Sequence, residues 1–136
     1  MKVVLDTNVL ISSTLWDNSS SQKLLFRLLS LGHEIYISSH ILSEYQRVLK
    51  RDFGFSTEDI IRILEKVLLF SKLAEPEAVV DIVKRDPTDN RIIECALSCS
   101  ADFIATYDRH LLEVVRYGGV KIAKPEAISK ELGPIC

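Results

Sequence analysis

The chain has 136 residues, of which 47% are hydrophobic and 26% charged, and its formal net charge is −2 at pH 7. This length and hydrophobic fraction predict one globular domain over residues 1–136, with a core that needs no disulfides. The negative net charge excludes a uniformly basic surface that coats nucleic acid. No apolar run reaches the roughly 18 residues of a membrane span, so we expect a soluble, cytoplasmic protein.

Strands and helices alternate in the first half of the chain. Residues 2–5 form an apolar run without polar alternation, which is typical of a strand buried on both faces. A polar cluster then precedes leucines at helical spacing, and this pattern predicts a capped amphipathic helix that ends at Gly32. Residues 34–38 are predicted to be a second strand, followed by Ser39 as the cap of a helix that carries Glu44.

The next predicted helix begins with the cap and acidic first turn of residues 56–59 and continues to residue 70. Apolar residues cover most of its circumference, so we expect it to be buried on several sides. Two arrangements remain open: the helix lies inside the core, or part of it packs against another subunit or a partner protein.

Residues 79–83 are predicted to be a short strand, and Asp86 to be the cap of a helix with Pro87 in its first turn. Further strands are predicted over residues 102–106 and 120–123. The alternation predicts an α/β fold: a single domain whose parallel sheet has about five strands, right-handed crossovers and helices on both faces.

Four carboxylates are predicted to gather at one edge of this sheet. Asp6 and Asp108 each follow a buried strand, whereas Glu44 and Asp89 lie on helix positions that border or share an apolar stripe. Ligand sites in open parallel sheets form outside the carboxyl ends of the strands. Oxygen-only ligands favour Mg²⁺ or Mn²⁺, ions that most often serve phosphoryl chemistry. The working hypothesis is a metal-dependent nuclease in which all four residues bind metal and act in catalysis.

Two of these carboxylates also have structural interpretations that the sequence leaves open. Glu44 precedes Arg47 by three residues, a spacing at which the two side chains can pair on the helix surface. Asp89 gains from the helix dipole whatever its function, although Asp86 is expected to provide the cap.

Four further polar residues are candidates for supporting the site or for binding substrate. Asn8 can steer Asp6 or a water molecule, and Thr106 can donate to a carboxylate or a phosphate. Arg91 and Arg109 are placed to meet a phosphodiester backbone, although arginines at such positions are more often surface residues. The histidines share no metal-ligand spacing, and the three cysteines are expected to be buried free thiols.

Four motifs in sequence order resemble the PIN-domain family, and more narrowly the PIN-type toxins of prokaryotic toxin–antitoxin systems. The motifs are Val4-Leu5-Asp6-Thr7-Asn8-Val9, Ser43-Glu44-Tyr45, Arg85-Asp86-Pro87-Thr88-Asp89-Asn90-Arg91-Ile92 and Ile104-Ala105-Thr106-Tyr107-Asp108-Arg109-His110-Leu111. Their order, their spacing and the overall length match over nearly the whole chain.

The resemblance implies an endoribonuclease that cleaves single-stranded RNA and depends on Mg²⁺ or Mn²⁺. It carries the family's acidic quartet over to Asp6, Glu44, Asp89 and Asp108. Proteins of this kind commonly form homodimers and are inhibited by a small antitoxin encoded beside them. We therefore expect a homodimer with a cognate antitoxin and no membrane association.

The chain departs from the family pattern beside Asp108. Tyr107 stands where a small or polar residue is usual, and His110 stands where a further acidic residue is common. Both departures would narrow a substrate channel or weaken a metal site. They leave open a catalytically degenerate PIN domain that binds RNA or a partner protein without cutting.

Two other classes of protein share parts of the pattern. A receiver-like signalling module also has an aspartate after its first strand, but it carries adjacent acidic residues there, where this chain has Leu5 and Asp6. A haloacid-dehalogenase-like phosphatase requires a second aspartate two residues later, and that position is Asn8. Neither class explains why four distant carboxylates should converge.

Overall fold

The computed structural model describes residues 1–75 and 89–133. Within these ranges the strands form one six-stranded sheet of order β3-β2-β1-β4-β6-β5. The strands are β1 (Lys2–Leu5), β2 (Glu34–Ile37), β3 (Lys72–Leu73), β4 (Phe103–Ala105), β5 (Arg116–Tyr117) and β6 (Val120–Ala123). All neighbouring strands are parallel except β5, which pairs antiparallel with β6. The predicted α/β class and parallel sheet are confirmed, with the short strands β3 and β5 added at the edges.

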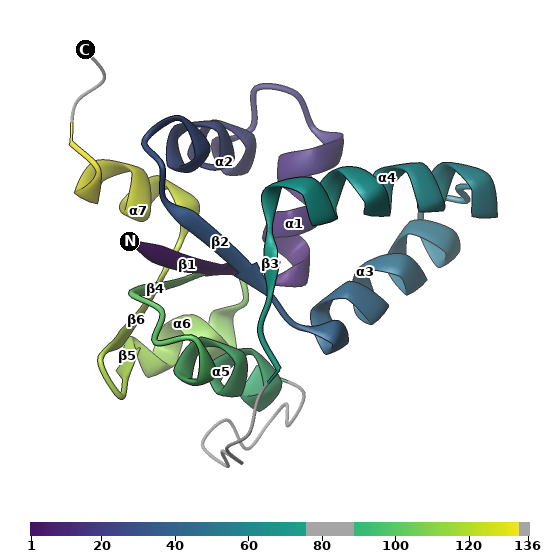
Figure 1. The fold of residues 1–136 in the computed structure, drawn as a ribbon. Helices are drawn as coiled ribbons and strands as arrows, with labels where there is room; N and C mark the ends of the chain where they lie inside the picture. Colours follow the sequence, from purple (N-terminus) through teal and green to yellow (C-terminus); the bar gives the residue numbers. More distant parts are fainter. Residues whose placement is uncertain (76–88, 134–136) are drawn as a thin grey trace.

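Helices cover both faces of the sheet, as predicted. The helices in the described ranges are α1 (Thr7–Leu15), α2 (Ser20–Ser30), α3 (Ser39–Arg51), α4 (Thr57–Phe70), α5 (Asp89–Ser98), α6 (Arg109–Val114) and α7 (Pro125–Glu131). Figure 1 shows α1, α2 and α7 on one side of the sheet and α5 and α6 on the other, while α3 and α4 extend past its end. None of the helices in the described part of the chain is long and apolar enough to cross a membrane.

Helix α7 was not predicted, and sequence periodicity does not reveal helix α1 either. Its apolar residues Val9, Leu10 and Ile11 are consecutive and all buried, so no polar stripe marks an outer face. The hydroxyls of Ser12, Ser13 and Thr14 donate to carbonyls three or four residues earlier, which satisfies these polar groups inside the helix. A helix buried on most sides lacks the amphipathic pattern on which such predictions depend.

The caps predicted for α2 and α4 are confirmed, and the cap predicted for α3 needs a correction. The Ser19 and Ser56 side chains accept hydrogen bonds from backbone amides in the first turns of α2 and α4. For α3 the cap is Ser38 rather than Ser39, because Ser38 has the extended backbone and accepts from the Ile41 amide at 3.1 Å. Ser39 is already the first helical residue.

Helix α4 presents apolar side chains to the surface instead of lying inside the core. Ile60 and Val67 are buried, but Ile61, Leu68 and Leu69 are exposed, and Leu69 is 86% exposed. Of the two arrangements that the sequence left open, burial inside this subunit is therefore excluded for that face. The helix keeps an apolar surface available for another protein chain.

Several predictions fall outside the described residues. These are the strand at 79–83, the cap at Asp86 and the first-turn position of Pro87. Cys95 and Cys99 are free thiols, the first buried and the second partly buried. Cys136 also lies outside the described ranges.

Arg27 of α2 ties the C-terminal end of α7 to the domain. Its Nη1 donates to the Ser129 carbonyl at 2.9 Å, and its Nη2 donates to the Gly133 carbonyl at 2.8 Å. A cation at a helix C-terminus also interacts favourably with the helix dipole. We expect Arg27→Ala to lower the free energy of unfolding by about 1.5–3 kcal/mol, the range for hydrogen bonds to charged groups.

Urea denaturation checks this expectation against a neutral substitution on the same helix. Lys23 is exposed on α2, and Lys23→Ala should change the free energy of unfolding by no more than about 0.5 kcal/mol. Equal stabilities of the two variants would show that the Arg27 contacts contribute nothing.

Candidate functional site

The site forms where the strand order of the sheet reverses. From β1 the chain continues to β2 on one side, and it later returns to β4 on the other side of β1. Leu5 at the end of β1 pairs with Ala105 at the end of β4, and the Asp6 amide donates to the Ala105 carbonyl at 3.0 Å. Asp6 and Asp108 therefore follow adjacent strands at the topological switch point, where open α/β sheets bind ligands.

Asp6 is a buried carboxylate with several hydrogen bonds. It is 6% exposed and caps α1 by accepting from the Thr7 amide at 2.7 Å. Burial raises the pKa of Asp6 from an ordinary value of 3.8 to about 6, although hydrogen bonds from Thr106 and Thr7 oppose the shift. The negative charges of Glu44 and Asp108 raise the same pKa further. Asp6 is thus a group whose charge a nearby cation would stabilise.

Thr106 and Asn8 hold Asp6 in place and link it to the next strand end. The Thr106 hydroxyl donates to Asp6 Oδ2 at 2.7 Å and accepts from the Asp108 amide at 2.9 Å. Asn8 Nδ2 donates to the same Asp6 oxygen at 3.3 Å, and Asn8 Oδ1 accepts from the Tyr107 amide at 3.2 Å. Both predicted supporting residues therefore contact Asp6 directly. They fix its orientation relative to the loop that carries Asp108.

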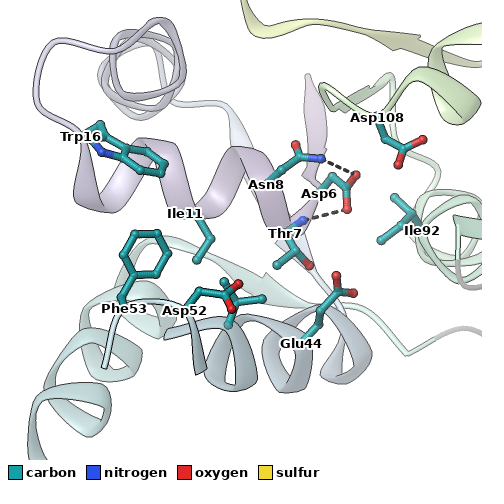
Figure 2. Close-up of a pocket in the computed structure, with 11 residues that line it drawn as sticks. Asp6, Thr7, Asn8, Ile11, Trp16, Glu44, Asp52, Phe53, Ile92 and Asp108 are labelled. Atoms are coloured by element: carbon teal, nitrogen blue, oxygen red, sulfur yellow. Dashed lines mark hydrogen bonds between the residues drawn. The ribbon is translucent and has the colours of Figure 1, made fainter. Parts of the chain in front are cut away.

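A pocket of about 380 Å³ opens beside this network. Figure 2 shows Asp6, Glu44 and Asp108 around one part of it, contributed by the end of β1, by α3 and by the start of α6. The lining residues are Asp6, Thr7, Asn8, Ile11, Trp16, Glu44, Val48, Asp52, Phe53, Ile92 and Asp108. Three of the four carboxylates predicted from the sequence are thus brought to one cavity, although their positions span about a hundred residues of the chain.

Glu44 and Asp108 keep different surroundings within the pocket. Glu44 is partly exposed, and its Oε2 lies 3.9 Å from His40 Nε2. The predicted alternative partner, Arg47, makes no ion pair with Glu44 among the contacts of the described residues. Asp108 caps α6 by accepting from the amides of His110 and Leu111. Asp108 therefore has a structural role in addition to its place in the pocket.

The fourth carboxylate, Asp89, is the first residue of α5, and its side chain is not among those described. Ile92, one turn later on α5, lines the pocket. Among the described side chains, no three Asp, Glu, His or Cys groups lie close enough together to hold a metal ion. The donor chemistry nevertheless suits Mg²⁺ or Mn²⁺, since every candidate ligand is an oxygen and Mg²⁺ usually binds only one or two carboxylates and retains water.

Seven lining residues were not predicted from the sequence as site residues: Thr7, Ile11, Trp16, Val48, Asp52, Phe53 and Ile92. The Thr7 hydroxyl is buried and has no hydrogen-bond partner in the described part of the chain. A buried hydroxyl without a partner is costly, so its place in the pocket wall marks a position for a polar ligand or water. Trp16 and Phe53 follow helices α1 and α3. The pattern of apolar residues does not predict that the ends of these two helices lie close together.

The two predicted arginines lie apart from the carboxylates. Arg91 Nη1 donates to both carboxylate oxygens of Glu94, at 3.1 and 3.3 Å. Arg109 is largely exposed on α6, 3.9 Å from Glu113. Neither arginine lines the pocket.

Comparison with known proteins agrees with the motifs. A family model described as PIN domain matches residues 2–110. The chain belongs to the PIN-domain family. No curated protein matches the sequence.

Two solved structures share the PIN fold with this chain. One is the crystal structure of VapBC2 from Rickettsia felis bound to a promoter DNA fragment, with a TM-score of 0.66 and 19% identity over 91% of this chain and 98% of that one. The other is VapC20 of Mycobacterium tuberculosis, a sarcin–ricin loop cleaving toxin, with a TM-score of 0.57 and 12% identity over 88% of this chain and 98% of that one. At these identities the likeness establishes the fold.

The departures from the PIN motif do not obstruct the pocket. The Tyr107 hydroxyl donates to Glu126 Oε1 on α7 at 2.5 Å, and Tyr107 is not among the pocket-lining residues. His110 likewise lies outside the lining, in the first turn of α6. The expected narrowing of a substrate channel by these two residues is therefore not found at this pocket.

Proposed function

We propose that this PIN domain is a metal-dependent endoribonuclease that cleaves single-stranded RNA. The observation that carries the proposal is the convergence of Asp6, Glu44 and Asp108 on one pocket at the switch point of the sheet. Membership of the PIN-domain family supports the same conclusion. The reaction would be hydrolysis of a phosphodiester bond that leaves a 3′-hydroxyl and a 5′-phosphate.

The proposed cofactor is Mg²⁺ or Mn²⁺, held by Asp6, Glu44, Asp89 and Asp108 directly or through water. Such an ion supplies a nucleophile at neutral pH and stabilises the charge that develops on the phosphate. The separation of the described carboxylates favours an ion that keeps part of its water shell. Burial is the largest cause of the raised pKa of Asp6. A bound cation would offset the cost of the negative charge on this buried carboxylate.

The remaining residues would position the reacting groups. Thr106 and Asn8 restrain the Asp6 carboxylate through the hydrogen bonds described above. The Thr7 hydroxyl would donate to a phosphate oxygen or to a water molecule in the pocket. Arg109 and Arg91 would contact the RNA backbone away from the bond that is cut.

The proposal is tested by incubating a labelled single-stranded RNA with the protein in Mg²⁺, Mn²⁺ or EDTA. Cleavage in either metal that stops in EDTA supports it, provided that the Asp6→Asn protein, purified in the same way, does not cut. Absence of cleavage under all conditions would favour the degenerate PIN domain instead. The spread of the described carboxylates is the observation that favours this second candidate.

We further propose that the protein is a cytoplasmic toxin controlled by a cognate antitoxin, and that it forms a homodimer. The structural likeness to VapBC2, a complex, and to the toxin VapC20 supports the partner. The exposed apolar side chains of α4 support a surface that associates with another chain. A strictly monomeric mass by light scattering at high concentration would contradict the homodimer.

Substituting Thr106 tests the positioning role. Thr106→Val keeps the shape of this fully buried residue but removes the hydroxyl shared by Asp6 and the Asp108 amide. We expect RNA cleavage to slow by about 10- to 100-fold, the usual cost of losing a group that orients metal ligands. Single-turnover cleavage rates measure the loss.

Thr106→Ser is the matched control because it keeps the hydroxyl, and it should retain most of the activity. Circular dichroism must show both variants folded. A folded Thr106→Val protein that cuts as fast as the wild type would show that the hydroxyl does not position Asp6 for the reaction.

A further inference from the structure

Two aromatic rings form the end of the pocket away from the carboxylates. Trp16 and Phe53 have ring centroids 5.8 Å apart and an interplanar angle of 67°, an edge-to-face pair. Phe55 continues the cluster, 6.4 Å from Phe53. Figure 2 shows Trp16 and Phe53 side by side across the pocket from Asp108, with Ile11 and Asp52 between. The cavity is therefore acidic at one end and aromatic at the other.

The rings are available to a ligand, although they belong to a pocket wall. Trp16 is 50% exposed and Phe53 is 41% exposed. In an edge-to-face pair the ring that contributes its edge leaves its own faces open. Large aromatic side chains are normally buried, and exposed ones that line a cavity indicate a binding surface more strongly than scattered apolar residues do.

Helix α1 sets the spacing between the two ends. Asp6 is its N-cap and Trp16 is its C-cap. Ten residues of helix correspond to about 15 Å, which a nucleic acid strand covers with a few nucleotides. One ligand can therefore occupy both ends only if it is an extended chain, such as a single strand of RNA.

The charges also differ between the two ends. At the aromatic end, Arg51 Nε and Nη2 donate to the two carboxylate oxygens of Asp52 at 2.7 and 3.1 Å, so this carboxylate is neutralised. At the other end, Asp6, Glu44 and Asp108 have no such partner among Lys and Arg in the described part of the chain. An uncharged flat group is suited to the aromatic end, whereas a phosphate requires a cation beside the carboxylates.

We propose that Trp16 and Phe53 form a stacking site for an unpaired base of the RNA substrate, a few nucleotides from the bond that is cut. The inference rests on the proposed function for the position of that bond. Stacking on aromatic faces is the general means by which proteins hold single-stranded bases without reading their sequence. It would also explain a preference for single strands, since a paired base cannot insert between side chains.

Fluorescence provides a test that does not depend on cleavage. Trp16 is the only tryptophan of the chain, so its emission reports on this end of the pocket alone. Titration with a short single-stranded RNA in Mg²⁺ should quench the emission, and an RNA with abasic sites throughout should not. Quenching without any cleavage would support the stacking site and would contradict the proposed nuclease function. Equal responses to the normal and the abasic RNA would overturn the stacking site.

Substitutions that remove a ring but keep apolar bulk give the second readout. Phe53→Leu should raise the KM for single-stranded RNA, or the Kd if nothing is cut, by about tenfold, as is usual for loss of one stacking ring. Phe53→Tyr keeps the ring and should rescue binding. Phe26→Leu is the matched control because Phe26 is 59% exposed on α2 and does not line the pocket.

The outcomes distinguish RNA from a protein ligand. Unchanged RNA binding by Phe53→Leu, with cleavage intact, would overturn the proposal while leaving the nuclease assignment unaffected. If Phe53→Leu no longer binds a partner protein but binds RNA as the wild type does, the proposal is also overturned. The rings would then belong to a protein interface. If Phe26→Leu weakens RNA binding as much as Phe53→Leu does, the effect is not specific to the pocket, and the proposal is overturned.

Discussion

Replacement of Asp6 by asparagine is expected to lower the rate of metal-dependent RNA cleavage at least about 10³-fold, more than the loss of a single preorganised hydrogen-bond donor usually costs. The amide has nearly the same shape but no charge, and one of its two terminal atoms cannot accept the hydrogen bonds that Thr106 and Asn8 donate to Asp6 Oδ2. Cleavage rates with saturating Mg²⁺ or Mn²⁺ measure the effect.

The fold should survive this substitution. The side-chain oxygen of the introduced asparagine would still accept from the Thr7 amide, and asparagine is as good a helix cap as aspartate. Asp59→Asn on α4 is a suitable control, since the Asp59 side chain is half exposed and lies outside the pocket. A folded Asp6→Asn protein that cuts at the wild-type rate would refute the assignment of Asp6 to the reaction.

The second large effect is a loss of the stability that Asp6 contributes to the metal-free protein as the pH rises. The folded state keeps a proton on Asp6 up to its raised pKa of about 6, whereas the unfolded chain releases it near 3.8. At Asp6 the folded state therefore binds more protons between these values, and the contribution of Asp6 to the free energy of unfolding falls as the pH rises from about 4 to about 6. A shift of this size corresponds to about 3 kcal/mol.

Chemical denaturation at a series of pH values in EDTA checks this expectation. The difference in unfolding free energy between the wild type and Asp6→Asn isolates the contribution of Asp6, and it should favour the variant progressively above about pH 4. Mg²⁺ or Mn²⁺ should reverse the loss in the wild type, because a bound ion stabilises the carboxylate. A difference that does not change with pH, with or without metal, would contradict the burial of an uncompensated charge.

The sheet and most helices could be predicted because their signals are local. The buried strand at residues 2–5, the helix that ends before Gly32 and the serine cap of α4 each depend on a few neighbouring residues. The order of the strands then decides which strand ends meet, and this placed Asp6 beside Asp108. Glu44 also lines the predicted site, from a position on the border of an apolar stripe.

The remaining features depend on packing between distant segments. Helix α1 has no amphipathic period because nearly all its sides are covered, and Trp16 could not be placed without that helix. The pairing of Trp16 with Phe53 joins the ends of two helices that are more than thirty residues apart in the sequence. For Arg91 the sequence left a substrate contact and a surface position open, and the structure shows it paired with Glu94 three residues later on the same helix.

Helix α1 would set the distance between the proposed cleavage site at Asp6 and the proposed stacking site at Trp16. Because one helix begins at Asp6 and ends at Trp16, its backbone would fix how far the proposed cut lies from the proposed stacked base. Each residue added to or removed from this helix would move Trp16 by about 1.5 Å and rotate it by about 100°. The position of cleavage along an RNA would thus be encoded in the length of a helix rather than in the identity of any base.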